Sequence, residues 1–160
     1  MKKAVIFDID GVLAEKSPDR DYCEHDKVHL DKPNTTIFRL AQYYFYVERF
    51  KYTRIIYITD RKELCRDKTI EFLCENWIKV RQSFLERVWL KLCRRFLKNL
   101  IDKSLLMRAD NDHRKAVVLK KEIYDNHIKG EYDVVACFDD DPEICEMYKN
   151  EGLLVFEVKR

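Results

Sequence analysis

Short runs of consecutive apolar residues alternate along the chain with longer segments in which apolar residues recur every three or four positions. Unbroken runs rich in Val, Ile and Phe are typical of strands that are covered on both faces of a parallel sheet. Five such runs predict strands at 3–9, 54–59, 104–109, 132–138 and 153–158. The helical pattern of the intervening segments predicts helices at 34–50, 61–77, 113–128 and 142–151.

This alternation of strands and helices indicates an α/β fold: a Rossmann-like, three-layer α/β/α sandwich around a parallel sheet of about five strands. A length of 160 residues suits a single domain over residues 1–160. The path between Gly11 and the second predicted strand is short, so no large cap over a site is expected.

One segment does not fit the alternation and is expected to form an extra basic helical insertion at about 78–103. Within it, residues 82–101 carry paired apolar residues every four positions, which predicts a helix with a wide apolar stripe. Its other side is mostly basic, with Arg87, Lys91, Arg94, Arg95 and Lys98. Three interpretations stay open: a packed helix with a solvated basic face, a basic lid or nucleic-acid-facing helix, or a helix that binds a partner or a membrane surface.

Charge is spread unevenly, although the formal net charge of the chain is only +2. Residues 77–108 hold nine Lys or Arg against Glu86 and Asp102, so this segment carries +7 and the remainder carries −5. Such an asymmetry indicates a polyanionic partner, for example a nucleic acid, on one side of the protein.

The cysteines and the apolar runs bear on the compartment in which the protein works. The six cysteines are scattered without a C-x-x-C pair, and three lie within apolar patterns, as free thiols do in a reducing compartment. No apolar run approaches the roughly 18 residues of a membrane span. Asp8 and Asp10 interrupt the first run too early for a signal peptide. A cytoplasmic protein without a membrane partner is expected.

Two acidic clusters follow apolar strands. Asp8 and Asp10 end the first strand and share a face, because side chains two apart in a strand point the same way. Asp139, Asp140 and Asp141 end a later strand. The carboxyl ends of parallel strands form the usual ligand crevice, so we expect the two clusters to meet there. Carboxylates so close together require protonation or a cation, and oxygen ligands suit a hard ion such as Mg²⁺.

Three further residues fit chemistry at this edge of the sheet. Gly11 allows a sharp turn or a close approach to a ligand. Thr59 ends the second strand, where its hydroxyl and the following amide could hold a phosphoryl oxygen. Lys120 lies in the helix before the fourth strand. Taken singly, Thr59 and Lys120 fit better an ordinary strand-end threonine and a surface lysine.

The combination of "DIDGVL", a strand that ends in Thr, a later Lys and "FDDD" resembles the haloacid dehalogenase-like phosphatase superfamily. The resemblance implies that Asp8 is the nucleophile that forms an aspartyl-phosphate, and that Asp10 is the general acid and base. It implies that Thr59 and Lys120 bind phosphoryl oxygens. It also implies a Mg²⁺ ion held by Asp8, the Asp10 carbonyl and Asp139, with Asp140 assisting.

A narrower resemblance covers nearly the whole chain through "KKAVIFDIDGVLAEK", "KPN", "IIYITDRKE", "NDHRKAVVLKKEIY" and "DDDPEICEMYKNEGL". These segments are similar to the 3′-phosphatase domain of bacteriophage-type polynucleotide kinase–phosphatases. The resemblance implies a substrate with a 3′-phosphate on a DNA or RNA end, and substrate-binding roles for Gly11, Arg61 and Arg20. Arg20 is offset by one residue from the arginine of that family, and Ala116-Val117 stand where the family has acidic residues.

The kinase half of such enzymes has no counterpart here, because Gly11, Gly130 and Gly152 cannot supply the glycines of a Walker A loop. Any kinase or ligase partner is therefore expected in another chain. Two other functions stay open: a small-molecule phosphatase acting on nucleotides or sugar phosphates, and a non-catalytic nucleic-acid-binding module. The oligomeric state is also open, since the stripe of 82–101 could be buried within one chain or between two.

Overall fold

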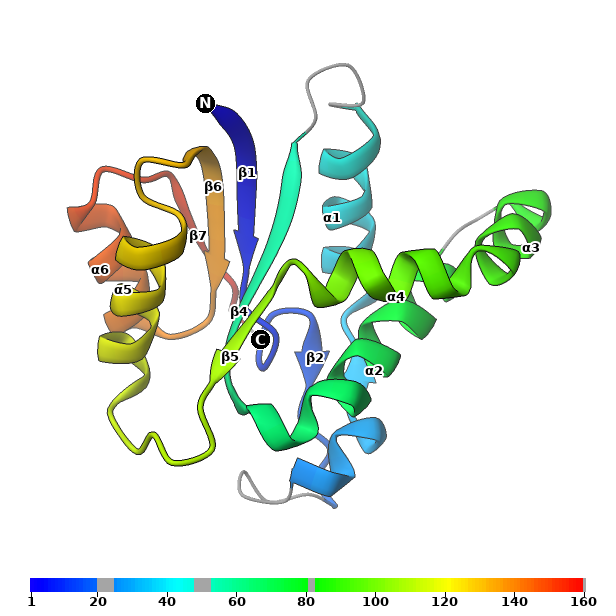
Figure 1. The fold of residues 1–160 in the computed structure, drawn as a ribbon, viewed down its shortest axis with the longest axis horizontal. Helices are drawn as coiled ribbons and strands as arrows, with labels where there is room; N and C mark the ends of the chain where they lie inside the picture. The colour runs from blue at the N-terminus through cyan, green and yellow to red at the C-terminus, as the bar shows by residue number, and fades with distance from the viewer. Residues whose placement is uncertain (20–24, 48–52, 81–82, 160) are drawn as a thin grey trace.

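A five-stranded parallel sheet forms the centre of the fold in the computed structural model, which describes residues 1–19, 25–47, 53–80 and 83–159 (Figure 1). In spatial order the strands are β5 (Leu105–Arg108), β4 (Arg54–Lys62), β1 (Lys2–Phe7), β6 (Tyr132–Asp139) and β7 (Val155–Glu157). Every pair of neighbouring strands is parallel. The strand order thus runs outward from β1 in both directions.

Helices cover both faces of this sheet and complete the three layers (Figure 1). One face carries α5 (Ala116–His127) and α6 (Pro142–Asn150). The other face carries α1 (Thr35–Val47), α2 (Arg66–Lys79) and α4 (Arg94–Asp102), while α3 (Phe84–Leu92) extends away from the sheet. The predicted Rossmann-like sandwich with a parallel sheet of five strands is confirmed.

Side chains that alternate along the strands fill two separate cores. Val5 and Phe7 of β1 join the core under α1 and α2, whereas Ala4 and Ile6 join the core under α5 and α6. In the first core the rings of Phe7 and Phe138 stack with their centroids 4.6 Å apart. Since both faces of the central strands are buried, each strand reads in the sequence as an unbroken apolar run.

The segment after the second strand differs from the predicted helix at 61–77. The strand β4 continues to Lys62 because Lys62 pairs with Arg108 of β5, and a 3₁₀ turn, η2 (Glu63–Cys65), precedes α2. A small antiparallel sheet of β2 (Ala14–Glu15) and β3 (Lys32–Pro33) and the 3₁₀ helix η1 (His25–Leu30) were not predicted. They occupy the connection between β1 and α1.

The apolar stripe of residues 82–101 forms two helices rather than one, because the chain leaves helical geometry at Cys93, between α3 and α4. On the basic side, Arg94 forms ion pairs with Glu71 and Glu75 of α2, and Lys98 forms one with Glu71. Two of the five basic residues on that side therefore form ion pairs within the chain. Among the described helices, none has the length and hydropathy needed to cross a membrane.

Candidate active site

The carboxyl ends of β1 and β6 bring the two acidic clusters together. Asp8 follows β1, and its amide donates a hydrogen bond to the carbonyl oxygen of Phe138 in β6, with an N···O distance of 2.9 Å. Carboxylate oxygens of Asp8, Asp139 and Asp140 all lie within 4.8 Å of one another. This edge of β1 is where the strand order reverses direction, the usual place for a ligand in an open parallel sheet.

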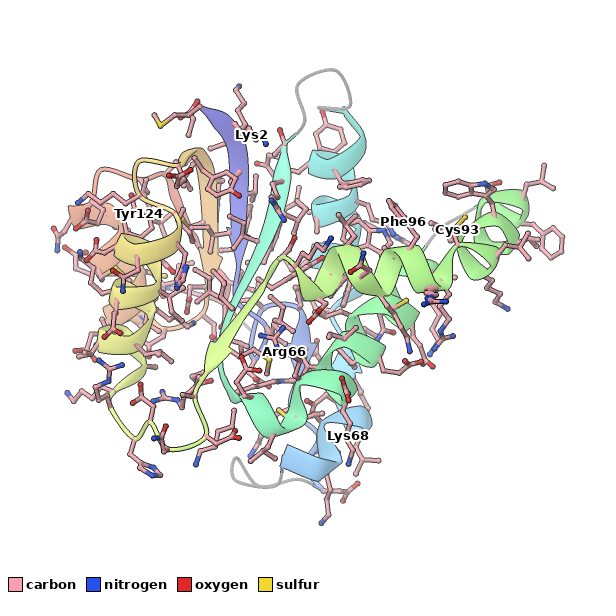
Figure 2. The ribbon with its side chains drawn as sticks, viewed as in Figure 1. Lys2, Arg66, Lys68, Cys93, Phe96 and Tyr124 are labelled. Atoms are coloured by element: carbon pink, nitrogen blue, oxygen red, sulfur yellow. The ribbon has the colours of Figure 1, made fainter. Side chains whose placement is uncertain are left out.

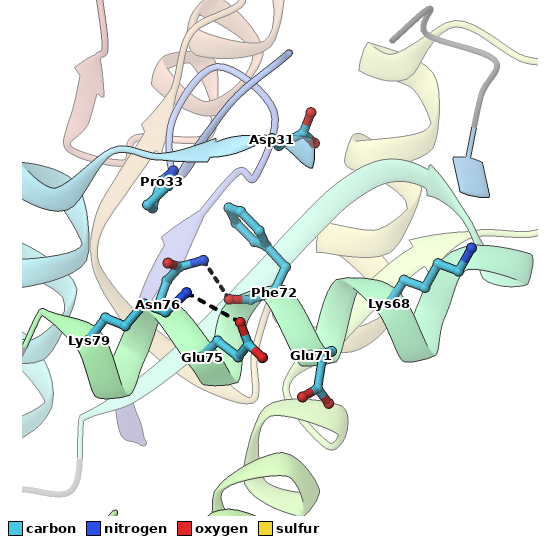
Figure 3. Close-up of a pocket in the computed structure, with 8 residues that line it drawn as sticks. All are labelled: Asp31, Pro33, Lys68, Glu71, Phe72, Glu75, Asn76 and Lys79. Atoms are coloured by element: carbon cyan, nitrogen blue, oxygen red, sulfur yellow. Dashed lines mark hydrogen bonds and ion pairs between the residues drawn. The ribbon is translucent and has the colours of Figure 1, made fainter. Parts of the chain in front are cut away.

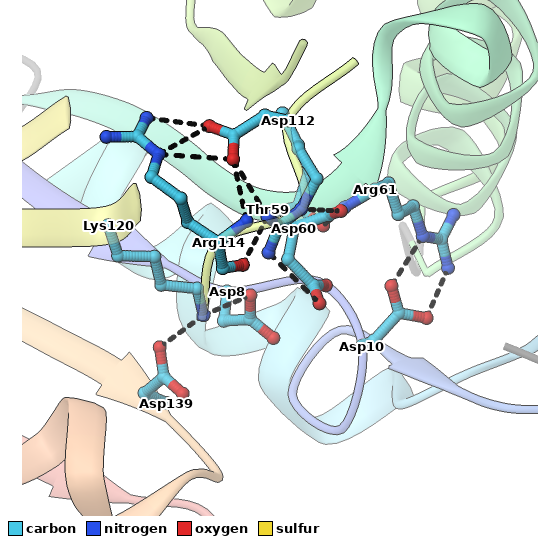
Figure 4. A network of polar contacts seen from close by, with 10 residues as sticks. Asp8, Asp10, Thr59, Asp60, Arg61, Asp112, Arg114, Lys120 and Asp139 are labelled. Carbon is cyan, nitrogen blue, oxygen red and sulfur yellow. Dashed lines mark hydrogen bonds and ion pairs between the residues drawn. The ribbon is translucent and has the colours of Figure 1, made fainter. Parts of the chain in front are cut away.

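Lys120 of α5 bridges two of these carboxylates (Figure 4). Its Nζ donates to Asp8 Oδ1 and to Asp139 Oδ2, at 2.7 Å in both cases, and all three side chains are buried. Burial alone would lower the pKa of Lys120, but the two carboxylates raise it above its ordinary value, so the ammonium stays charged. Burial, together with the nearby charge of Asp139, raises the pKa of Asp8 although Lys120 acts in the opposite direction.

The chemistry of this donor set fits a divalent cation. Three carboxylates and one lysine leave a formal charge of −2 at the site. All the carboxylate donors are oxygen atoms, which Mg²⁺ prefers. Asp8, Asp139 and Asp140 therefore match the predicted metal ligands in position, and Asp10 could contribute only through its main chain, because its carboxylate is directed at Arg61.

Gly11 lies directly beside Asp140 of the second acidic cluster. Its φ is +93°, and a Cβ at this position would be 1.9 Å from Asp140 Oδ2. The Gly11 amide donates to the Ala14 carbonyl at 2.8 Å, which closes the turn after Asp10. Glycine is therefore required here for two reasons: its φ is positive, and the Asp140 carboxylate leaves no room for a Cβ.

We expect Gly11→Ala to lower the free energy of unfolding by about 1–3 kcal/mol through backbone strain, and to lower phosphate release further by displacing Asp140. The matched control is Gly130→Ala, because Gly130 has φ +84° but a Cβ added there would meet no described atom within 4 Å. Thermal unfolding and phosphate release should be measured for both variants. Equal effects of the two substitutions on activity would contradict a role for the contact with Asp140.

Asp10 is held by a buried arginine. Arg61 Nε and Nη2 donate to the two carboxylate oxygens of Asp10 at 2.6 and 2.8 Å (Figure 4). Nη2 also donates to Asp31 Oδ2 at 2.7 Å, and Asp31 Oδ1 accepts a hydrogen bond from the Ser17 amide at 3.1 Å. Burial alone would lower the pKa of Arg61, but Asp10 and Asp31 raise it, so the guanidinium remains charged. Arg61 Nη1 is buried and has no hydrogen-bond partner among the described residues.

Two predicted site residues remain, Thr59 and Arg20. Thr59 is fully buried near the end of β4, and its Oγ1 accepts a hydrogen bond from the Arg61 amide at 3.2 Å. Arg20 lies outside the described residues. The structure thus brings Thr59 and Arg61 to the same strand end, next to the acidic clusters (Figure 4).

Two buried residues of this region, Asp31 and Arg108, were not singled out in the sequence. Arg108 of β5 donates to the carbonyl oxygens of Asp60 and Arg114, at 3.1 and 2.6 Å, and so joins the segment after Thr59 to the segment before α5. Asp31 adjoins the "KPN" segment but lies in no periodic pattern. A single charged residue of this kind gives no sign in the sequence that it is buried.

Asp31 also lines a groove of about 260 Å³ between β3 and α2 (Figure 3). Phe72 and Pro33 contribute its apolar surface, and charged residues of both signs surround them: Lys68, Lys79, Glu71 and Glu75. Its Glu71 and Glu75 already pair with α4. Because its charged side chains are of both signs, the groove has no predominant charge that would select an anionic or a cationic ligand.

A central parallel strand that ends in two aspartates, with a lysine and further aspartates from the neighbouring segments, defines a phosphatase of the haloacid dehalogenase-like superfamily. A family model described as "Polynucleotide kinase PNKP phosphatase domain" matches residues 2–160. The chain belongs to this family of phosphatase domains.

Similar proteins are longer than this chain. A protein of Autographa californica nuclear polyhedrosis virus, described as a bifunctional polynucleotide kinase/RNA ligase, is 25% identical over 159 residues, which are 99% of this chain and 20% of that protein. The structure of the Pnkp1/Rnl/Hen1 RNA repair complex contains a chain with 26% identity and a TM-score of 0.73, and the match covers 98% of this chain and 42% of that one. A second structure of the Pnkp1/Rnl/Hen1 complex gives 26% identity and a TM-score of 0.73, with 99% and 46% covered. This chain thus spans a fifth of the viral relative and less than half of each structural relative.

Proposed function

We propose that this chain is a Mg²⁺-dependent polynucleotide 3′-phosphatase, which removes the phosphate from the 3′ end of a DNA or RNA strand. The observation that carries the proposal is the buried Asp8–Lys120–Asp139 arrangement at the end of the central strand of a PNKP-type phosphatase domain. The relatives that are described as a polynucleotide kinase/RNA ligase and as part of an RNA repair complex support a nucleic acid end as the substrate.

The proposed reaction has two displacements at phosphorus. A carboxylate oxygen of Asp8 attacks the phosphorus atom, the bond from phosphorus to the 3′ oxygen breaks, and Asp10 gives its proton to that oxygen. A water molecule then loses a proton to Asp10 and attacks the aspartyl-phosphate. The bond from phosphorus to the Asp8 oxygen breaks, inorganic phosphate leaves, and both aspartates return to their starting states.

Asp8, Asp139 and Asp140, with the Asp10 carbonyl, would hold Mg²⁺, which supplies positive charge against the phosphate and the nucleophile when bound. Lys120 fixes the side chain of Asp8 through its hydrogen bond and keeps Asp139 beside it. Thr59 and Arg61 are proposed to bind phosphoryl oxygens. The Nη1 atom of Arg61, without an acceptor among the described residues, supports that assignment.

The Arg61–Asp31 contact yields a test of the role of Asp10. Asp31→Asn removes one charged partner of Arg61 Nη2, so Arg61 positions the Asp10 carboxylate less firmly. We expect about a tenfold to hundredfold loss of turnover for substrates whose leaving oxygen needs a proton. A 3′-phosphorylated oligonucleotide has such a leaving group, whereas an aryl phosphate leaves readily without one. Turnover of both substrates should be compared in the same variant. An equal loss on both would contradict the positioning of Asp10 through Arg61.

The surroundings of the site also support a polymer as substrate. Between β1 and α1 the described residues contain only the short elements β2, η1 and β3. The helices α3 and α4 make their main contacts with α2 and with each other, so they give no support to a lid over Asp8 (Figure 1). Kinase or ligase activity is proposed to come from a partner, and the free buried thiols support a reducing, cytoplasmic location.

One panel of substrates tests the proposed function: oligonucleotides with a 3′- or a 5′-phosphate, mononucleotides and an aryl phosphate, each with Mg²⁺ or with a chelator. We expect Mg²⁺-dependent release of phosphate from the 3′-phosphorylated oligonucleotides, without competition from excess free nucleotide. A preference for mononucleotides would favour the small-molecule phosphatase. No release from any ester would favour the non-catalytic binding module.

A further inference from the structure

An apolar surface lies on α3 and on the first turn of α4. It consists of six large side chains that are between 40% and 81% exposed: Phe84, Leu85, Val88, Trp89, Leu92 and Phe96. We call it the α3 outer face. Figure 2 shows this end of the molecule, with Phe96 on α4 and Cys93 at the junction with α3. Monomeric proteins seldom expose so many large apolar side chains side by side.

The helical spacing places the five members of this surface that belong to α3 on one side of that helix. Phe84, Val88 and Leu92 are four apart, so they form one row along the helix. Leu90 belongs to the opposite side, and it is buried against the protein. The protein's own core therefore uses only the inner side of α3 and leaves the outer row uncovered.

Part of the positive charge near this surface is neutralised within the protein. Arg94 and Lys98 are directed at Glu71 and Glu75 of α2. Lys91 and Arg95 nevertheless stay exposed beside the surface, so a nucleic acid is the competing occupant that the test must exclude. Phe84, Trp89 and Phe96 are aromatic, but the other half of the surface is aliphatic. Leu85, Val88 and Leu92 offer no ring on which a base could stack, and this favours a protein as the occupant.

The size and shape of the surface fit a second copy of the same chain. At these exposures the three aromatic side chains alone present roughly 300–500 Å², and Leu85, Val88 and Leu92 add to that area. A standard interface buries about 800 Å² per partner. The helix α3, which carries five of the six residues, projects from the body of the protein (Figure 1). A projecting helix with a row of apolar residues can pack beside its own symmetry mate, which is how isologous dimers form.

We propose that the α3 outer face is the interface of a homodimer, in which the α3 helices of two copies pack side by side. This inference is independent of the phosphatase activity, because none of the six residues belongs to the site at Asp8. It answers the open question of how the stripe of 82–101 is covered: its inner part within one chain and its outer part between two.

The test is the mass in solution of the purified chain and of a double variant, Leu85→Glu with Leu92→Glu. Light scattering after size exclusion and sedimentation velocity should be run from about 1 to about 100 µM. We expect a dimer for the unchanged chain and at least a roughly tenfold weaker association for the double variant. Both leucines are exposed, so the fold and phosphate release should not change. The matched control is Leu154→Glu, an exposed leucine outside the surface, which should leave the dimer intact.

Two results would overturn the proposal. A monomer at every concentration would do so, and so would a dimer that the double variant does not weaken. If the monomeric chain instead binds a single-stranded oligonucleotide, and the double variant loses that binding, the α3 outer face binds nucleic acid and the homodimer is wrong.

Discussion

Asp8→Asn is expected to abolish phosphate release from a 3′-phosphorylated oligonucleotide, with a loss of roughly a thousandfold or more, because the amide cannot form the acyl phosphate. The same change should not unfold the protein. Burial raises the pKa of Asp8, so its carboxylate is less stable in the folded chain than in the unfolded one at neutral pH. Asparagine removes that cost and leaves Lys120 paired with Asp139. The melting temperature should therefore equal or exceed that of the unchanged protein.

The measurements are phosphate release with saturating Mg²⁺ and thermal unfolding of the same preparations. Asp133→Asn serves as the matched control, because Asp133 is an exposed aspartate at the other end of the sheet. Full activity of the Asp8→Asn variant would show that Asp8 is not the nucleophile. A melting temperature several degrees lower would show that the Lys120–Asp8 ion pair stabilises the fold more than burial of Asp8 costs.

Lys120→Met is expected to cost about 3–5 kcal/mol of the free energy of unfolding, because it leaves the buried carboxylates of Asp8 and Asp139 without their common cation. Phosphate release should be lost as well. Chemical denaturation at neutral pH measures the change in stability. Millimolar Mg²⁺ should raise the melting temperature of this variant more than that of the unchanged protein, since the remaining cluster is more negative.

The neighbouring lysine provides the control for this substitution. Lys121 is partly exposed and pairs with Asp125 and Glu151 on the surface, so Lys121→Met should lower the free energy of unfolding far less than Lys120→Met. If the two variants were equally stable, the ion pairs of Lys120 would not hold the two acidic clusters together. A Mg²⁺ effect of the same size on both variants would contradict the metal site at Asp8 and Asp139.

The sequence was sufficient for the architecture because the central strands are covered on both faces. Burial on both sides requires apolar residues at consecutive positions, so β1, β4 and β6 are visible as unbroken runs. The start of α2 could not be predicted in the same way. Lys62 is extended because it pairs with Arg108, a partner that is distant in the sequence and absent from any local pattern.

The residues of the candidate site also divide into those that could be predicted from the sequence and those that could not. Asp8, Asp139 and Lys120 meet at strand ends or match a motif, so their proximity could be predicted before the structure was known. Asp31 could not be found, because its burial depends on the fold of the connection after β1 rather than on its neighbours in the sequence. The stripe of 82–101 likewise indicated that one side of a helix needed a cover, but periodicity does not say whether that cover lies in the same chain.

The central place of β1 in the sheet also has a consequence for synthesis on the ribosome. The ribosome makes its two neighbours later, first β4 and then β6. The strand that leads to Asp8 therefore emerges before both neighbours and keeps one hydrogen-bonding edge unpaired until residues 132–139 have left the exit tunnel. Long-range parallel pairing of this kind is slow, and an unpaired edge invites aggregation. A nascent chain of this domain should accordingly depend on chaperones until β6 inserts, and it should acquire phosphatase activity only after that step.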